Sequence, residues 1–150
     1  MSGMAFGIDA IAHRAALDAD GLTAAVLGTG IDVVYPRGNH ALYDDIAERG
    51  VVLSEFKQGT GPFRGCFPRR NRIIAGLCRL TIVVEAGEKS GSLITATCAA
   101  EFGRSVAAVP GAIDSPQSAG SNQLLRDGAH VIASIDDALK ALIETGLFQD

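Results

Sequence analysis

Short apolar runs alternate with amphipathic stretches along nearly the whole chain. Five runs of β-branched or small residues are predicted to be strands: Thr23–Leu27, Val51–Leu53, Leu80–Val84, Ser105–Val109 and His130–Ala133. These runs are apolar on both faces and flanked by glycine, which is typical of strands buried in a parallel sheet. Met1–Gly3 resembles the carboxyl end of a further strand whose body is not in the sequence.

The segments between the strands have helical spacing. In Ile8–Ala19 the apolar stripe predicted to face the core contains Ile8, Ile11, Ala12, Ala15 and Ala16. Further helices are expected from a cap at Asn39 to a stop at Gly50, over Asn71–Leu77, from Ser92 to Gly103, from Ser121 or Asn122 to Gly128, and over Asp136–Thr145. This alternation predicts a doubly wound α/β fold with a mostly parallel, Rossmann-like sheet and helices on both faces.

Composition is consistent with one globular domain over residues 1–150, because 47% of the residues are hydrophobic and 20% are charged. No run of about 18 apolar residues is present, which excludes a membrane-spanning helix. The three cysteines, Cys66, Cys78 and Cys98, form no close pair, which favours a reducing, cytoplasmic location.

Charge is distributed unevenly along the chain. The net charge is −4, which taken alone argues against a nucleic-acid-binding protein. Residues 57–104, however, hold eight basic and three acidic side chains, a balance of +5, between two acidic segments of −5 and −4. This pattern indicates a localised site for an anion.

Two glycine-containing segments are candidate phosphate loops. GTGID at Gly28–Asp32 resembles the start of a dinucleotide-binding fingerprint, but Val33 stands where the third glycine is required, so no nicotinamide cofactor is predicted. Gly28 and Gly30 remain phosphate-loop candidates, or they serve only a sharp turn. The Lys89–Ser92 segment opens a helix, where backbone N–H groups suit an anionic oxygen; alternatively, Ser92 is a simple helix cap and Lys89 a solvated side chain.

The segment Phe67–Leu77 has three arginines within four residues next to an aromatic ring. Arginine matches phosphate geometry and an exposed ring can stack on an unpaired base; the alternative is that the arginines solvate the outer face of a core helix. His13, His40 and His130 have no metal-ligand spacing, and no serine lies in a nucleophile elbow. No catalytic residue, metal or cofactor is predicted.

Seven motifs together carry a family resemblance. They are SGMAFGIDAIAH, VLGTGIDVVYPRGN, LSEF, FPRRNRIIAGL, VVEAGEKSGSLITA, VPG and GSNQLLRDGA, and they occur in the expected order over almost the whole chain. The sequence closely resembles the central Rossmann-like domain of the DNA-processing protein A (DprA/Smf) family. In that family the domain begins with an earlier strand and a G-S-R loop, so we expect this chain to be a single domain lacking its first strand and loop.

The resemblance implies a cytoplasmic, non-enzymatic homodimer that binds single-stranded DNA and helps load a RecA-type recombinase in natural transformation. It implies a base-stacking role for Phe67 and a basic DNA contact at Arg37. The other DNA-binding candidates are Arg69, Arg70, Asn71, Arg72, Lys89, Ser90, Gly91 and Ser92, and Ser2 and Gly3 join the phosphate-loop candidates. We expect the cations of the arginine segment and of the Lys89 loop to converge on one furrow at the rim of the sheet.

Two alternatives remain open at this stage. Related Rossmann-like folds include nucleotide phosphoribohydrolases, but these carry a glutamate in the helix turn where this chain has Leu93–Ala96. The second alternative is an interaction module that dimerises through an exposed sheet edge or the last helix. In that case its DNA site would be degenerate.

Overall fold

The structure, a computed structural model, describes residues 1–146. The chain divides into two compact units, the first spanning Met1–Ile74 and the second beginning at Ala75. Each unit is described by itself. Both have parallel strands with covering helices, which confirms the predicted α/β class, although the strands form two sheets.

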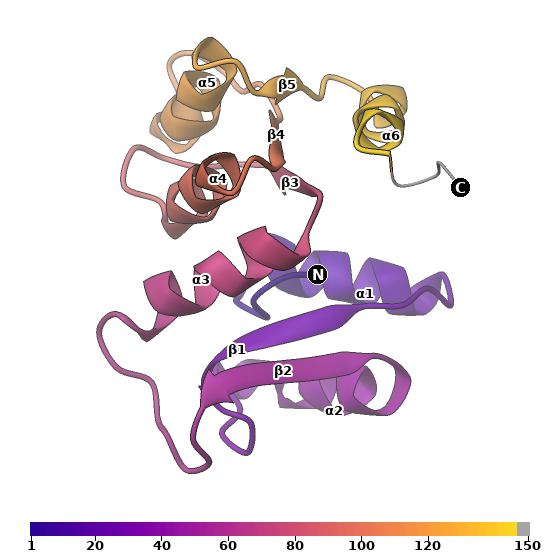
Figure 1. Cartoon of the computed structure of the whole chain (residues 1–150), viewed down its shortest axis with the longest axis vertical. Helices are drawn as coiled ribbons and strands as arrows, with labels where there is room; N and C mark the ends of the chain where they lie inside the picture. The colour runs from indigo at the N-terminus through magenta and orange to yellow at the C-terminus, as the bar shows by residue number, and fades with distance from the viewer. Residues whose placement is uncertain (147–150) are drawn as a thin grey trace. The chain divides into compact units, whose positions relative to one another are not determined.

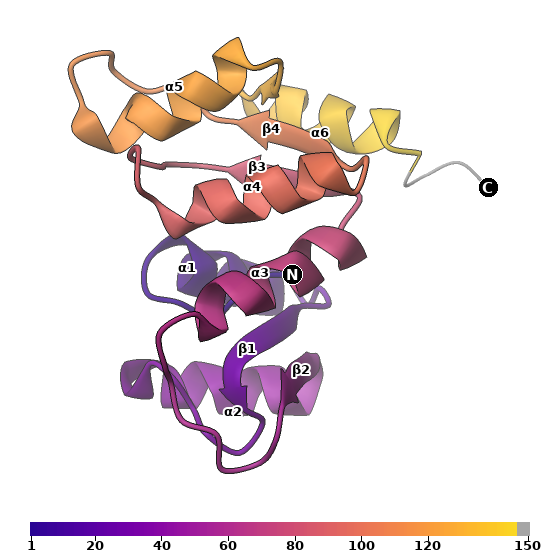
Figure 2. The same ribbon diagram turned by 60° about the vertical axis from the view of Figure 1, so that its left-hand side comes forward.

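The first unit is built on two parallel strands, β1 (Ala24–Gly30) and β2 (Val51–Phe56). Ala24 pairs with Val51, and the register shifts between Leu27 and Gly30. The helices are α1 (Ile8–Asp18), the short 3-10 helix η1 (Arg37–Asn39), α2 (His40–Arg49) and α3 (Cys66–Leu77), whose first turns belong to this unit. Figures 1 and 2 show α1 and α2 on one face of the strand pair and α3 on the other.

The N-terminal residues form one β-bridge with β1, on the side of β1 that does not pair with β2. Ser2 forms a parallel bridge with Ala25. The Ser2 amide donates to the Ala24 carbonyl at 3.1 Å, and the Val26 amide donates to the Ser2 carbonyl at 3.0 Å. Ser2 therefore pairs with β1 in the parallel sense through this one bridge.

Alternation along β1 sorts its side chains between the two helical layers. Ala25 and Leu27 are fully buried against Leu17 of α1 and against Leu42 and Ile46 of α2.

The predicted core stripe of α1 is wrong. Ile8 is 45% exposed and Ile11 62%, whereas His13 and Leu17 are buried. His13 occupies an inward position because its Nδ1 pairs with the Thr23 hydroxyl at 2.6 Å. A hydrophobic pattern that counts histidine as polar misses this face.

The second unit contains a three-stranded parallel sheet in the order β3-β4-β5, with β4 in the centre. Its strands are β3 (Leu80–Val83), β4 (Ser105–Ala108) and β5 (His130–Val131), and its helices are α4 (Gly91–Glu101), η2 (Pro116–Ser118), α5 (Ala119–Arg126) and α6 (Ile135–Glu144).

Side-chain alternation on β4 again separates two layers. Ala108 packs with Val83 and with Ala96 of α4, and Leu124 and Leu125 of α5 lie against the same cluster. Ala107 faces the other way, toward Ile132 and Ala141 of α6. The second unit therefore has helices on both faces of its sheet, as predicted.

All five strands were predicted within a few residues, but helix starts differ. Helix α3 begins at Cys66 rather than Asn71, with Pro68 inside its first turn, where a missing N–H costs nothing. The cap of α4 is Ser90, whose hydroxyl accepts from the Ser92 amide. Asn39 precedes α2 without a side-chain cap bond, because its amide group donates to the Met4 carbonyl at 2.9 Å. Helix α5 begins at Ala119, before the predicted Ser121.

Within residues 1–146, no helix is long and apolar enough to cross a membrane.

Candidate nucleic-acid interface

An aromatic pair lies near the carboxyl end of β1. The rings of Tyr35 and Phe67 have centroids 5.5 Å apart and are tilted by 32°. The Phe67 ring also lies under the Arg70 guanidinium, 5.8 Å from its carbon, and against Gly28, where a Cβ would come within 2.8 Å of the ring. Tyr35 is 42% exposed. The site therefore offers an aromatic surface whose outer member is Tyr35.

Hydrogen bonds hold the loop that carries Tyr35. The Thr29 hydroxyl donates to the Val33 carbonyl at 2.6 Å, and both carboxylate oxygens of Asp32 accept from the Gly59 amide at 2.8 and 3.0 Å. The Tyr43 hydroxyl donates to the Ile31 carbonyl at 2.7 Å, and Asn39 is tied to Met4. Bonds at several points along the loop fix its shape before any ligand arrives.

Arg70 differs from the exposed phosphate contact that the sequence suggests. It is only 6% exposed, and its Nη1 donates to the carbonyls of Gly3 at 2.7 Å and Val26 at 2.5 Å. Its Nε donates to the Asn71 side chain at 3.0 Å. Burial lowers the pKa of Arg70, and the charge of the Asp9 carboxylate opposes that shift. Arg70 thus bridges the N-terminal segment to β1. Because Arg70 and Asn71 are both buried, the candidate interface does not include them.

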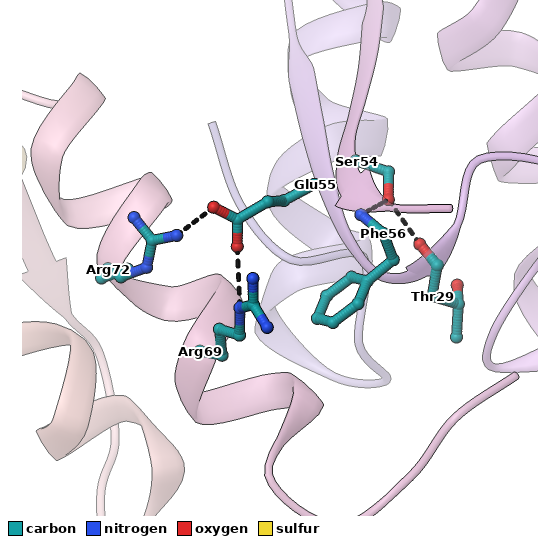
Figure 3. A network of polar contacts seen from close by, with 6 residues as sticks. All are labelled: Thr29, Ser54, Glu55, Phe56, Arg69 and Arg72. Atoms are coloured by element: carbon teal, nitrogen blue, oxygen red, sulfur yellow. Dashed lines mark hydrogen bonds and ion pairs between the residues drawn. The ribbon is translucent and has the colours of Figure 1, made fainter. Parts of the chain in front are cut away.

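Arg69 and Arg72 are exposed on α3 and share one carboxylate. The Arg69 Nε donates to Glu55 Oε2 at 2.9 Å, and an Arg72 Nη donates to Glu55 Oε1. Figure 3 shows Glu55 reaching from β2 to both arginines. The hydrogen bond from Arg72 is the main cause that lowers the pKa of Glu55, so the carboxylate stays ionised at neutral pH. The three side chains together carry a net charge of +1.

Packing accounts for the predicted phosphate-loop glycines of the first unit. Gly28 and Gly30 lie within β1, and a Cβ at Gly30 would approach the Lys57 carbonyl to 2.5 Å. The Gly3 amide donates to the Asp9 carboxylate at 3.0 Å, and the Ser2 amide is used in the bridge to β1. The Gly30 amide donates to the Thr60 carbonyl at 2.8 Å, so the amides of Ser2, Gly3 and Gly30 are all bonded within the protein.

The Lys89–Ser92 loop belongs to the second unit. The Ser90 amide donates to the Gly87 carbonyl at 3.0 Å, and the Ser92 amide donates to the Ser90 hydroxyl at 3.3 Å. These two amides are bonded within the protein, whereas the Lys89 side chain is exposed. The part of this loop best placed to meet an anion is therefore the Lys89 ammonium group.

A cavity of about 610 Å³ lies in the second unit, beyond the carboxyl ends of β3 and β4. This is the edge of a parallel sheet where α/β proteins usually hold ligands. Its lining mixes apolar and polar side chains: Glu88, Leu93, Pro110, Gly111, Ile113, Ala119, Gly120, Asn122, Gln123 and Arg126. Lys89, Ser90 and Ser92 are not among these residues.

Two exposed arginines of the first unit form no ion pair within residues 1–146. Arg37 lies two residues after Tyr35, and Arg64 lies three residues before Phe67. At no more than about 3.6 Å per residue, each arginine Cα is within about 11 Å of its aromatic neighbour's Cα. Sequence reasoning missed Tyr35 and Arg64, although the aromatic residue in YPRGN was a usable signal.

No group of three or more histidine, cysteine or acidic residues able to hold a metal occurs in the described part of the chain.

Comparison with known proteins gives consistent matches. Residues 1–143 match the family model described as DNA recombination-mediator protein A. The chain is 49% identical to Protein Smf of Synechocystis over 142 residues, covering 95% of this chain and 36% of that protein. It is 51% identical to DNA processing protein DprA of Streptococcus pneumoniae over 139 residues, covering 93% and 49%. The chain therefore spans between a third and a half of the length of these relatives.

Solved structures give the same result. The fold superposes on DNA processing protein A from S. pneumoniae with a TM-score of 0.86 and 50% identity, covering 93% of this chain and 49% of the other. It also superposes on DNA processing protein A from Helicobacter pylori, studied for its single-stranded DNA binding mode, with a TM-score of 0.86 and 33% identity over 95% of this chain and 65% of the other. With this agreement in sequence and structure, the chain belongs to the DNA recombination-mediator protein A family.

Proposed function

We propose that this chain is a non-catalytic, single-stranded DNA-binding domain that acts in DNA processing. The observation that carries the proposal is the rigid aromatic pair, Tyr35 and Phe67, with the exposed cations Arg37 and Arg64 next to it in sequence. Aromatic rings combined with a basic surface are the usual means of holding single strands without sequence preference. Family membership and the DNA-binding relative support the same assignment.

Arg69 and Arg72 add to this surface although both are paired. Each guanidinium has five N–H donors and uses only part of them on Glu55, so phosphate oxygens can bind to the remaining donors. Lys89 supplies a further cation from the second unit. On the basis of the family resemblance, we also propose that the protein is a cytoplasmic homodimer. In this proposal it helps load a RecA-type recombinase in natural transformation.

A salt titration tests the binding. A fluorescent oligothymidine strand is titrated with the chain at several salt concentrations, and the log–log slope is expected to be about −0.7 for each phosphate neutralised. The double variant Arg37→Ala, Arg64→Ala should weaken binding. If each arginine neutralises one phosphate, the magnitude of the log–log slope should fall by about 1.4. Arg14→Ala is the matched control, because Arg14 is an exposed arginine of the same unit already paired with Asp45. Binding whose affinity does not depend on salt concentration contradicts the proposal, as does a loss of affinity in Arg14→Ala equal to that in the double variant.

A further inference from the structure

One face of α5 lines the cavity of the second unit. Four lining residues follow the i, i+3, i+4, i+7 spacing that places side chains on the same side of a helix: Ala119, Asn122, Gln123 and Arg126. Glu88 and Leu93 contribute from the start of α4 and the loop before it, and Pro110, Gly111 and Ile113 from the loop after β4. The lining therefore comes from the second unit alone.

The loop after β4 is fixed against α5. The Asn122 side chain binds both backbone groups of Gly111, accepting from its amide at 3.1 Å and donating to its carbonyl at 3.0 Å. The Gly120 amide donates to the Ala86 carbonyl at 2.8 Å, which joins α5 to the segment after β3. The cavity volume of about 610 Å³ lies within the range of about 300–1,000 Å³ that is usual for small-molecule sites. The cavity is thus preformed and of a suitable size for a small ligand.

Two opposite charges line this cavity without a partner in the described part of the chain. Neither Glu88 nor Arg126 forms an ion pair or a side-chain hydrogen bond within residues 1–146. The Glu88 carboxylate can accept hydrogen bonds, and the Arg126 guanidinium can donate them. A ligand that carries both an N–H donor group and an anionic group satisfies both side chains.

Apolar side chains complete the lining. Leu93, Pro110 and Ile113 have no polar side-chain atoms. Ile113 is 99% exposed, so a ring bound in the cavity would cover apolar surface that is now in contact with water. The ligand class that fits has a flat, partly apolar ring, an N–H donor and an anionic group.

We propose that the cavity binds a nucleoside monophosphate whose base carries an amino group. The base packs against Leu93, Pro110 and Ile113. Its amino group donates to the Glu88 carboxylate, as the cytosine amino group does to acidic side chains, and its phosphate binds the Arg126 guanidinium. Thymine has a carbonyl oxygen in place of the amino group, so the site should disfavour it. This second site goes beyond the proposed function, which rests on the first unit.

Calorimetric titration of the whole chain with dAMP, dCMP, dGMP and dTMP tests the site. The three nucleotides with an amino group should bind about 10- to 100-fold more tightly than dTMP, the factor expected for one hydrogen bond to a charged acceptor. Glu88→Ala should abolish this preference. Arg126→Gln should weaken the binding of dCMP by about 10-fold and leave the binding of deoxycytidine, which has no phosphate, unchanged.

The second unit offers matched controls. Glu101 and Lys140 are exposed charged residues of this unit that do not line the cavity. Glu101→Ala and Lys140→Gln should therefore bind all four nucleotides as the unchanged chain does.

The nucleotide can be free or can be the end of a strand. Oligothymidine that begins with one 5′-phosphorylated deoxycytidine is added to the complex with dCMP. Displacement of dCMP by this strand, but not by plain oligothymidine, identifies a strand end as the ligand. Retention of dCMP in both mixtures identifies a free nucleotide.

The outcomes distinguish this inference from the proposed function. A preference over dTMP that is lost in Glu88→Ala, a phosphate-dependent loss in Arg126→Gln and unchanged controls support the inference. Absence of binding by all four nucleotides, equal affinities for dTMP and the other three, or controls as damaging as the variants refute it. The proposed function is tested separately with plain oligothymidine, whose bases have no amino group.

Discussion

Replacing Arg70 tests whether its buried guanidinium joins the N-terminal segment to β1. In Arg70→Met the side chain keeps an unbranched apolar stem but is shorter and loses every donor. The carbonyls of Gly3 and Val26, both on buried residues, then lose their shared partner. An unsatisfied buried acceptor costs about 1–3 kcal/mol, so with two acceptors the variant should lose about 2–6 kcal/mol of unfolding free energy. That loss is a large part of the stability of a small unit.

Urea unfolding followed by tyrosine emission is the appropriate assay. Both tyrosines, Tyr35 and Tyr43, lie in the first unit, so the signal reports that unit alone. Arg72→Met on the same helix is the control and should change the midpoint much less, because Arg72 is exposed. Arg70→Lys should recover only part of the loss, since an ammonium group lacks the planar fork of arginine. Equal midpoints for the Arg70 and Arg72 variants would refute the reasoning.

Three further predictions follow from single side chains. Burial lowers the pKa of His13 below 6.5, so the unfolded chain binds a proton more readily than the folded one. The first unit should therefore lose stability as the pH falls from 6.5 toward the lower folded-state pKa. Urea titrations at several pH values should show a weaker pH dependence in His13→Gln. Glu55→Gln should release Arg69 and Arg72, tighten oligothymidine binding at low salt and steepen the slope by about 0.7–1.4; an unchanged slope contradicts this. Ser90→Ala should cost about 1 kcal/mol in the second unit, seen as faster amide exchange in α4.

Strands were predictable because their signal is local. Runs such as Ser105–Val109 and Leu80–Val84 are short, apolar at consecutive positions and rich in β-branched or small residues, which is typical of strands in a parallel sheet. Their observed limits, Ser105–Ala108 and Leu80–Val83, differ by one residue. The orientation of α1 was not predictable in this way, because the burial of His13 depends on Thr23, ten residues away.

The arginine segment also shows that local sequence does not predict which side chains are buried. Three arginines within four residues look alike in sequence, yet one is buried and two are exposed. The position of the Arg70 side chain is determined by hydrogen bonds to carbonyls 44 and 67 residues away in sequence. The positions of its exposed neighbours, Arg69 and Arg72, are determined by their ion pairs with Glu55 on β2. A charge count detects the cationic segment, whereas the partner of each cation is a tertiary property.

The shortness of β5 has a consequence for how copies of this chain can meet. An outer strand with many unpaired backbone groups is a template on which another chain can add a strand and polymerise. Here only His130 and Val131 pair with β4, so an incoming segment would find almost no ladder to extend. On that side of the second unit, association has to proceed through side chains, whose shape and charge can be selective, and not through generic backbone pairing.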